Sequence, residues 1–221
     1  MGKQTLAQQL EELVNSSLIN EQQLDVLLAG FRRLAGSGIL DSALREGALA
    51  PDFSLLDQQG QAQSLHAHLE HGPLLLQFFR GDWCPFCQAQ LRALSASRDE
   101  ISALGASILC LSPETPEKHA RMAAEHGLKL SLLSDPGGLT AHAWGVAYDL
   151  TAAELELYRE LGIEPTQSAQ SSTEFLPVPA SYIILPGARI AWRFIDPDWR
   201  RRSEPADMLS ALRAITAGAQ G

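Results

Sequence analysis

The most informative shortages in this 221-residue sequence are of cysteine, of basic residues and of long apolar runs. Three cysteines are too few for the disulfide framework of a small secreted protein. There are 17 Lys and Arg against 26 Asp and Glu, and the net charge of −9 argues against nucleic acid or an anionic membrane as a partner. No apolar stretch approaches the roughly 20 residues of a membrane span. We therefore expect a soluble globular protein.

The chain also lacks a recognisable targeting signal and internal repeats. It begins with Met1-Gly2-Lys3 and continues in an amphipathic polar pattern without the apolar core of a signal peptide, so we expect a cytoplasmic location. The local basic cluster, Arg200-Arg201-Arg202, is predicted to be a solvated turn rather than a phosphate site. We find no internal repeat.

Strand and helix patterns alternate through residues 48–221, and a hairpin ends the series of strands. This order predicts an α/β domain with a central mixed β-sheet flanked by helices. The expected strands lie at 51–56, 74–79, 107–111, 130–133, 182–185 and 189–195. The expected helices lie from the cysteine pair to about 104, from an opening at 112–117 to 126–127, at 139–144 and at 204–217. An inserted helix at 151–161 and a polar loop at 162–174 form an insertion at about 151–176.

Residues 1–47 are predicted to be an N-terminal helical extension. Apolar residues recur at helical spacing over 4–18 and again after Asn20, which with Gln23 resembles a capping box. The arm carries no reactive cluster, so its apolar faces should pack on the main domain or on a second subunit of a homodimer. The sequence leaves both open.

The chain is organised around Trp83-Cys84-Pro85-Phe86-Cys87, which lies between the apolar run 74–79 and a helical pattern. A helix N-terminus presents unpaired N–H groups and a partial positive charge, which favour thiolate over thiol. We expect Cys84 at the exposed mouth of this turn and Cys87 one helical turn deeper. Cys110, within the strand at 107–111, is predicted to be a small buried apolar residue.

The cysteine pair can serve redox chemistry or bind a metal. Structural zinc needs four ligands, and the sequence has one C-x-x-C pair without a second ligand pair at matching spacing. His66, His68 and His71 do not share one helical face, so we expect no metal there either. Redox chemistry needs only the pair, a lowered pKa and access for substrate, and so requires no cofactor.

Several segments resemble a known family. Gly81-Asp82-Trp83-Cys84-Pro85-Phe86-Cys87 is similar to a thioredoxin-fold active site, and the surrounding chain resembles the peroxiredoxin-like branch of the AhpC/TSA superfamily. The segments that carry the resemblance are Ala50-Pro51-Asp52-Phe53, Phe78-Phe79-Arg80-Gly81-Asp82, Leu111-Ser112-Pro113-Glu114 and Leu133-Ser134-Asp135-Pro136. The resemblance covers about residues 48–200 and implies a thioredoxin-like fold. It also implies a thiol-based redox enzyme that an external thioredoxin-like or small-thiol donor reduces.

The active-site pattern departs from the family at three positions. In the peroxiredoxin register Cys87 is the peroxide-attacking cysteine, while Arg80 stands at the usual proline and Cys84 at the usual threonine. The usual arginine before the late strand falls at Pro179, which instead resembles the cis-proline beside the cysteines of thioredoxin-like proteins. Trp83 and Pro85 are expected to shape and shield the turn.

The chemistry predicted from these residues is a Cys84/Cys87 pair that cycles between dithiol and disulfide. Expected exposure favours Cys84 as the attacking thiolate, whereas the peroxiredoxin register favours Cys87. The substrate is a peroxide or, alternatively, a protein or small-molecule disulfide. Arg80 either forms a surface ion pair with Asp82 or stabilises the thiolate.

Overall fold

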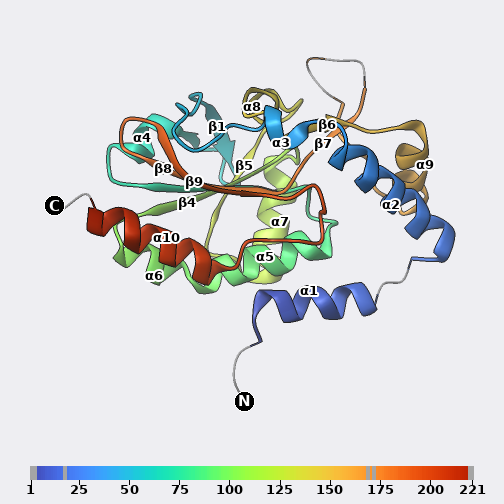
Figure 1. The fold of residues 1–221 in the computed structure, drawn as a ribbon, viewed down its shortest axis with the longest axis horizontal. Coiled ribbons are helices and arrows are strands. Elements are labelled where there is room, and N and C mark those ends of the chain that lie inside the picture. Colours follow the sequence, from blue (N-terminus) through green and yellow to red (C-terminus); the bar gives the residue numbers. More distant parts are fainter. Residues whose placement is uncertain (1–3, 17–18, 168–169, 171–172, 219–221) are drawn as a thin grey trace.

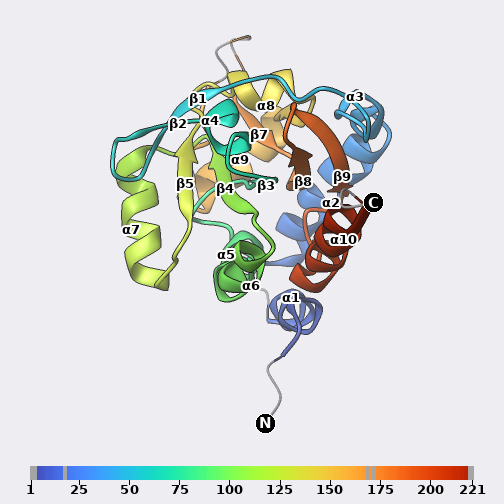
Figure 2. The same ribbon diagram turned by 90° about the vertical axis from the view of Figure 1, so that its left-hand side faces the viewer.

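The computed structural model describes residues 4–16, 19–167, 170 and 173–218. A mixed sheet forms the middle layer, with helices on both faces (Figures 1 and 2). The strands of this sheet, in the spatial order β2-β1-β5-β4-β3-β8-β9, are β1 (Ser54–Asp57), β2 (Ala62–Ser64), β3 (Leu74–Phe78), β4 (Ser107–Ser112), β5 (Ser131–Ser134), β8 (Ala180–Leu185) and β9 (Arg189–Ile195). The pairs β3–β4 and β4–β5 are parallel, and the other pairs are antiparallel. The predicted fold class is confirmed.

Helices cover both faces of the sheet, and a short second sheet stands beside it. That sheet pairs β6 (Ala147–Asp149) with β7 (Phe175–Pro177). The helices are α1 (Leu6–Asn15), α2 (Glu21–Ala35), α3 (Ile39–Ser42), α4 (Leu65–Leu69), α5 (Pro85–Ala96), α6 (Arg98–Ala103), α7 (Pro116–His126), α8 (Leu139–Ala143), α9 (Ala152–Glu160) and α10 (Pro205–Gly218).

The central strand β3 explains the unbroken apolar run in the sequence. All five of its residues are buried, because alternate side chains enter two different cores. Leu75 packs with α5, α6, α7 and α10, whereas Leu74, Leu76 and Phe78 pack on the opposite face with α4 and α8. A strand with helices on both faces cannot show polar alternation, and its carboxyl end is where the cysteine turn begins.

Most predicted elements are confirmed, with differences at three places. The helix expected to run to about 104 is interrupted at Ser97, so α5 and α6 are separate helices. The strand expected at 51–56 begins at Ser54. The short strands β2, β6 and β7 were not predicted, because three-residue strands carry too little periodicity to be recognised. In the loop predicted at 162–174, residues 168–169 and 171–172 lie outside the described residues.

The N-terminal arm packs on its own chain. Leu6 and Leu10 of α1 are buried in the same apolar cluster as α5, and Asn20 and Gln23 form the predicted capping box at the start of α2. Arg33 of α2 pairs with Glu154 of α9 at 2.9 Å. Of the two predicted arrangements, the structure therefore shows the arm packed on the main domain, and the homodimer stays a prediction.

Gly145→Ala is expected to destabilise the protein because the backbone of the arm leaves no room for a side chain at this glycine. The φ of Gly145 is +67°, and an added Cβ would collide with the backbone carbonyl of Ser42 in α3. We expect a loss of about 2–4 kcal/mol of unfolding free energy, from combined strain and overlap. Chemical denaturation measures it. Gly60→Ala is the matched control, because its φ is +76° with nothing within 4 Å of the added Cβ, and its loss should be smaller. Equal losses in the two variants would contradict the overlap.

Candidate active site

The cysteine turn connects the carboxyl end of β3 to the first turn of α5. The Phe79 N–H donates to the Leu111 carbonyl at 2.9 Å, which extends the parallel pairing of β3 and β4 by one residue. Cys84 is the N-cap of α5, with extended backbone angles, and Pro85 occupies the first helical position, where its missing N–H costs nothing. Cys87 lies in the first turn. The strand, turn and helix predicted around the pair are confirmed.

Both cysteines are buried, so the expectation that Cys84 lies at an exposed mouth is wrong. The exposed fraction is 1% for Cys84 and 0% for Cys87. Part of the cover comes from the neighbouring Trp83, and the rest comes from distant parts of the chain: Trp199 and Leu13 of α1 also pack against the cluster that contains the pair. The exposure of Cys84 could not be predicted from the motif, because it depends on which residues from the two ends of the chain cover the motif.

The surroundings favour a thiolate at Cys87 rather than at Cys84. Burial alone would raise the pKa of Cys87, but the hydrogen bond from the Cys84 thiol, the charge of Arg202, and the backbone N–H and charge of Arg80 together lower it to about 5. Burial, the hydrogen bond to Cys87 and the charge of that thiolate raise the pKa of Cys84 well above its ordinary range, despite Arg80 and Arg202. These surroundings favour a single negative charge on the pair, carried by the deeper sulfur, to which Arg202 donates.

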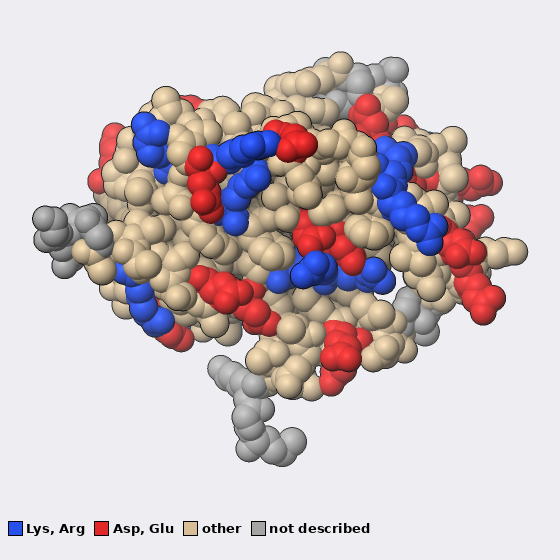
Figure 3. All heavy atoms as spheres, in the orientation of Figure 1, with Lys and Arg blue, Asp and Glu red and all other residues tan. Residues whose placement is uncertain are grey.

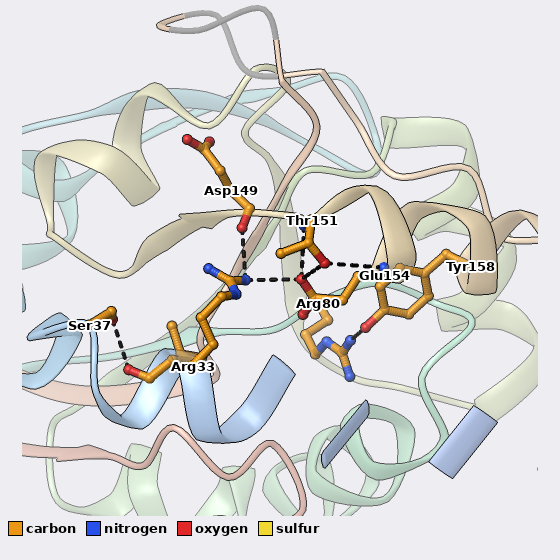
Figure 4. A network of polar contacts seen from close by, with 8 residues as sticks. Arg33, Ser37, Arg80, Asp149, Thr151, Glu154 and Tyr158 are labelled. Carbon is orange, nitrogen blue, oxygen red and sulfur yellow. Dashed lines mark hydrogen bonds and ion pairs between the residues drawn. The ribbon is translucent and has the colours of Figure 1, made fainter. Parts of the chain in front are cut away.

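Arg80 lies inside an aromatic enclosure instead of at the surface. Its side chain is 3% exposed, and its guanidinium carbon lies 4.8 Å from the ring centre of Trp83 and 5.5 Å from those of Tyr158 and Trp199. The guanidinium also donates to the Tyr158 hydroxyl (Figure 4). Asp82 is not its partner, since Asp82 pairs with Arg121 at 3.6 Å. The prediction of a surface ion pair between Arg80 and Asp82 is therefore wrong, and Arg80 is a buried cation beside the cysteines.

The inserted helix α9 supplies a wall of this enclosure. Tyr158 is carried on α9, whose N-terminus is closed by a capping box between Thr151 and Glu154. Glu154 also accepts from Arg33 of α2, which in turn donates to the Asp149 carbonyl at 3.0 Å (Figure 4). The arm and the insertion thus brace each other, and the insertion positions the tyrosine against Arg80. The sequence offered no sign of this role for Tyr158.

Arg202 is the main functional residue that the sequence reasoning missed. Its Nη2 lies 3.6 Å from the Cys87 Sγ, and the residue is 8% exposed. The prediction of a solvated turn is wrong for Arg202, although Arg201 is exposed. The sequence places Asp196 and Asp198 close enough to pair with two of the three arginines, but Glu204 also lies nearby, so nothing in it marks Arg202 as the arginine that turns inward.

Pro179 directly precedes β8, and Gln77 lies in β3, whose carboxyl end leads into the cysteine turn. The Val178–Pro179 peptide bond is trans, so the expectation that Pro179 resembles the cis-proline of thioredoxin-like proteins is wrong. Gln77 is buried, where it accepts from Ser181 at 2.5 Å and from Gln90 of α5 at 3.1 Å. A neutral amide therefore ties β3, α5 and β8 together beneath the cysteines.

The remaining candidates lie apart from this chemistry. Cys110 is buried in β4, as predicted, and burial raises the pKa of its thiol. His68 lies 2.9 Å from Gln63 and 3.2 Å from Ser107. Within the described ranges no three His, Cys, Asp or Glu side chains are placed to hold a metal ion. In the same ranges, no helix has both the length and the apolar character needed to cross a bilayer.

Solved structures with the same fold include several peroxiredoxins. The peroxidoxin BcpB of Mycobacterium tuberculosis is 23% identical, with a TM-score of 0.61 over 78% of this chain and 98% of that one. A peroxiredoxin-like protein of Aquifex aeolicus is 13% identical, with a TM-score of 0.62 over 78% of this chain and 88% of that one. These likenesses confirm the thioredoxin-like fold.

Sequence comparison gives the family. Peroxiredoxin Q of Triticum aestivum, described as chloroplastic, is 33% identical over 119 residues, which are 54% of each chain. The Arabidopsis thaliana protein of the same description is 33% identical over 116 residues, 52% of this chain and 53% of its own. The chain thus spans about half the length of the curated relatives it matches. The sequence model of the AhpC/TSA family matches residues 47–193, about two thirds of the chain. With the fold and the cysteine turn described above, this match shows that the chain belongs to the AhpC/TSA family.

Proposed function

We propose that this protein is a thiol-dependent peroxidase in which Cys87 attacks the peroxide and Cys84 resolves the product. The observation that carries the proposal is the setting of Cys87: its sulfur lies in the first turn of α5, in contact with the guanidinium of Arg202 and near that of Arg80. The thiolate, not the thiol, is the nucleophile toward peroxides. This assignment departs from the expectation that Cys84 attacks first, which rested on an exposure that Cys84 does not have.

The attack converts thiolate and peroxide into sulfenic acid and alcohol. The Cys87 sulfur forms a bond to one peroxide oxygen, the O–O bond breaks, and the second oxygen leaves as alkoxide or hydroxide and takes up a proton. The sulfur is oxidised and the peroxide is reduced. The charges of Arg80 and Arg202 stand where negative charge leaves sulfur and develops on the departing oxygen.

The second step follows from the change in charge at Cys87. Two of the three causes that raise the pKa of Cys84 are its hydrogen bond to the Cys87 thiolate and the charge of that thiolate. Both vanish when Cys87 becomes a neutral sulfenic acid, while Arg80 and Arg202 still favour an anion. Cys84 can then ionise and attack the Cys87 sulfur, which forms the disulfide and releases water. The two cysteines ionise in sequence, one charge at a time.

The regenerating reductant is proposed to be a thioredoxin-like protein or a small thiol, which takes the disulfide back to two thiols. The disulfide would form beneath the surface, so a small thiol needs less rearrangement to reach it. We also propose a cytoplasmic location, since a reducing compartment keeps the dithiol available. The alternative of a reductase acting on protein disulfides is less well supported, because such a substrate needs an exposed attacking sulfur and Cys84 is 1% exposed.

Stopped-flow mixing of the reduced protein with hydrogen peroxide tests the function. We expect a second-order rate constant at pH 7 about thirtyfold above that of free cysteine, because a pKa near 5 makes Cys87 fully ionised where free cysteine is a few per cent thiolate. Insulin as a competing disulfide substrate should react more slowly than the peroxide. A peroxide rate constant no greater than that of free cysteine would overturn the peroxidase proposal.

A further inference from the structure

Residues 196–204, which connect β9 to α10, form a segment with its own internal charge pairing. Arg200 pairs with Asp198 at 2.8 Å, and Arg201 pairs with Asp196 at 3.2 Å. Basic and acidic side chains also intermix over the face of the molecule seen in Figure 3. The first two of three consecutive arginines are thus neutralised locally, and only Arg202 turns inward.

Arg202 is buried without a carboxylate counter-charge. In the part of the chain that the structure describes, no acidic side chain forms an ion pair with it, and its Nε has no hydrogen-bond partner. Its Nη1 donates to the carbonyls of Trp199 and Arg201, and its Nη2 points to the Cys87 sulfur at 3.6 Å. Burying a cation is costly unless an opposite charge accompanies it, and the nearest group able to carry one is the Cys87 thiolate.

The segment is held in this position from three sides. Trp199 packs edge-on against Phe86 of α5, with ring centres 4.9 Å apart. The Ser203 hydroxyl lies 2.8 Å from that of Ser181 in β8. The Glu204 carboxylate accepts from the backbone N–H groups of Leu6 at 3.2 Å and Ala7 at 2.5 Å, which are the first two N–H groups of α1. The N-terminal helix is therefore tied to the segment that carries Arg202.

We propose that Arg202 is a catalytic residue of this site, the cation that pairs with the attacking Cys87 sulfur, and that Glu204 and α1 are its positioning elements. Arg202 and α1 both lie outside the 47–193 match to the family, so the family resemblance assigns neither. The family's usual arginine position is occupied here by Pro179. The proposal rests on the proposed function for the role of Cys87, and it makes the thiolate depend on both ends of the chain.

Titration of thiolate absorbance near 240 nm in the Cys84→Ser background tests the role of Arg202 without any peroxide. Only Cys87 and Cys110 remain as thiols there, and burial moves Cys110 out of the range. Arg202→Gln should raise the midpoint of Cys87 by about 1–3 pH units, as expected for a cation lost at this distance. Arg202→Lys should raise it less, because the positive charge remains.

Arg201→Gln is the matched control, since it removes the same charge one residue away from a side chain that pairs with Asp196. It should leave the midpoint within about 0.3 of the parent, which is small against the shift that a contacting charge causes. An unmoved midpoint in Arg202→Gln, or equal shifts in the Gln variants of Arg201 and Arg202, would overturn the proposal. Should Arg202→Gln fail to fold, Arg202→Met decides it in the same way, because it also removes the charge: an unmoved midpoint would overturn the proposal.

Glu204→Gln separates positioning from direct electrostatics. Loss of a nearby negative charge by itself lowers a thiol pKa, whereas loss of the anchor that holds Arg202 raises it. We expect a rise, and an unchanged or lowered midpoint would overturn the role of Glu204 and α1. The titrations also distinguish the two proposals. If Arg202→Gln shifts the midpoint but the parent protein does not react with peroxide, the role of Arg202 stands and the peroxidase proposal is overturned. If the midpoint does not shift and the parent protein reacts with peroxide, the peroxidase proposal stands and the role of Arg202 is overturned.

Discussion

Cys87→Ser is expected to abolish the reaction of the reduced protein with hydrogen peroxide, by roughly a thousandfold or more, because a serine hydroxyl is not ionised near neutral pH and is a far weaker nucleophile. Cys84→Ser should retain the first oxidation, since the serine hydroxyl can still donate a hydrogen bond to the Cys87 sulfur. It should stop at a sulfenic acid, because no second thiol remains in the turn to form the disulfide.

Two measurements check this division of roles. Rapid mixing with hydrogen peroxide gives the rate of the first step, and dimedone labelling followed by mass spectrometry finds the sulfenic acid on Cys87 of the Cys84→Ser protein. Cys110→Ala is the control, because Cys110 is fully buried in β4 and has no part in the proposed chemistry. The opposite pattern, with Cys84→Ser inert and Cys87→Ser oxidised to a sulfenic acid, would assign the attack to Cys84.

The reduced protein is expected to become more stable as the pH rises from 6.5 to 8, and Cys87→Ser is expected to lack most of that gain. The folded pKa of Cys87 is lowered to about 5, below the ordinary value of about 8.5 in the unfolded chain. Between these values the unfolded state binds more protons, so the free energy of unfolding rises by about 1.4 kcal/mol per pH unit. The contribution is complete above the unfolded pKa and is lost as the pH falls through the folded pKa.

Over that interval the expected gain is about 2 kcal/mol, or about 4–8 °C in Tm for a chain of this size. Thermal unfolding in the presence of a non-thiol reductant measures it. Burial lowers the pKa of His119 to about 4, so the free energy of unfolding also rises with pH at lower pH values. This contribution is the same in the parent protein and in Cys87→Ser. Above about pH 8.5 the slope should reverse, because burial holds the thiols of Cys84 and Cys110 protonated while those of the unfolded chain ionise. Identical pH profiles for the two proteins would mean that Cys87 is not the thiolate.

Local features of the fold could be predicted because they depend on neighbouring residues. The start of α2 follows from the Asn20–Gln23 capping box, and the end of α7 follows from Gly127, with φ of +59°. The hairpin of β8 and β9 follows from strand patterns around Pro186-Gly187. The short strands β6 and β7 could not be found in this way, because their pairing joins segments separated by the α9 insertion.

Residues that are neighbours in the chain predict the kind of chemistry at this site. A C-x-x-C pair after a buried strand and at the start of a helix is typical of a redox site, and those relations lie within a few residues of each other. The tertiary structure decided which sulfur bears the charge. Burial of Cys84, the aromatic enclosure of Arg80 and the contact of Arg202 with Cys87 come from residues more than 100 positions apart in the chain, such as Arg202 and Cys87 at a separation of 115. A thiol pKa is the sum of burial, hydrogen bonds and charges in space, and only the folded chain brings those charges together.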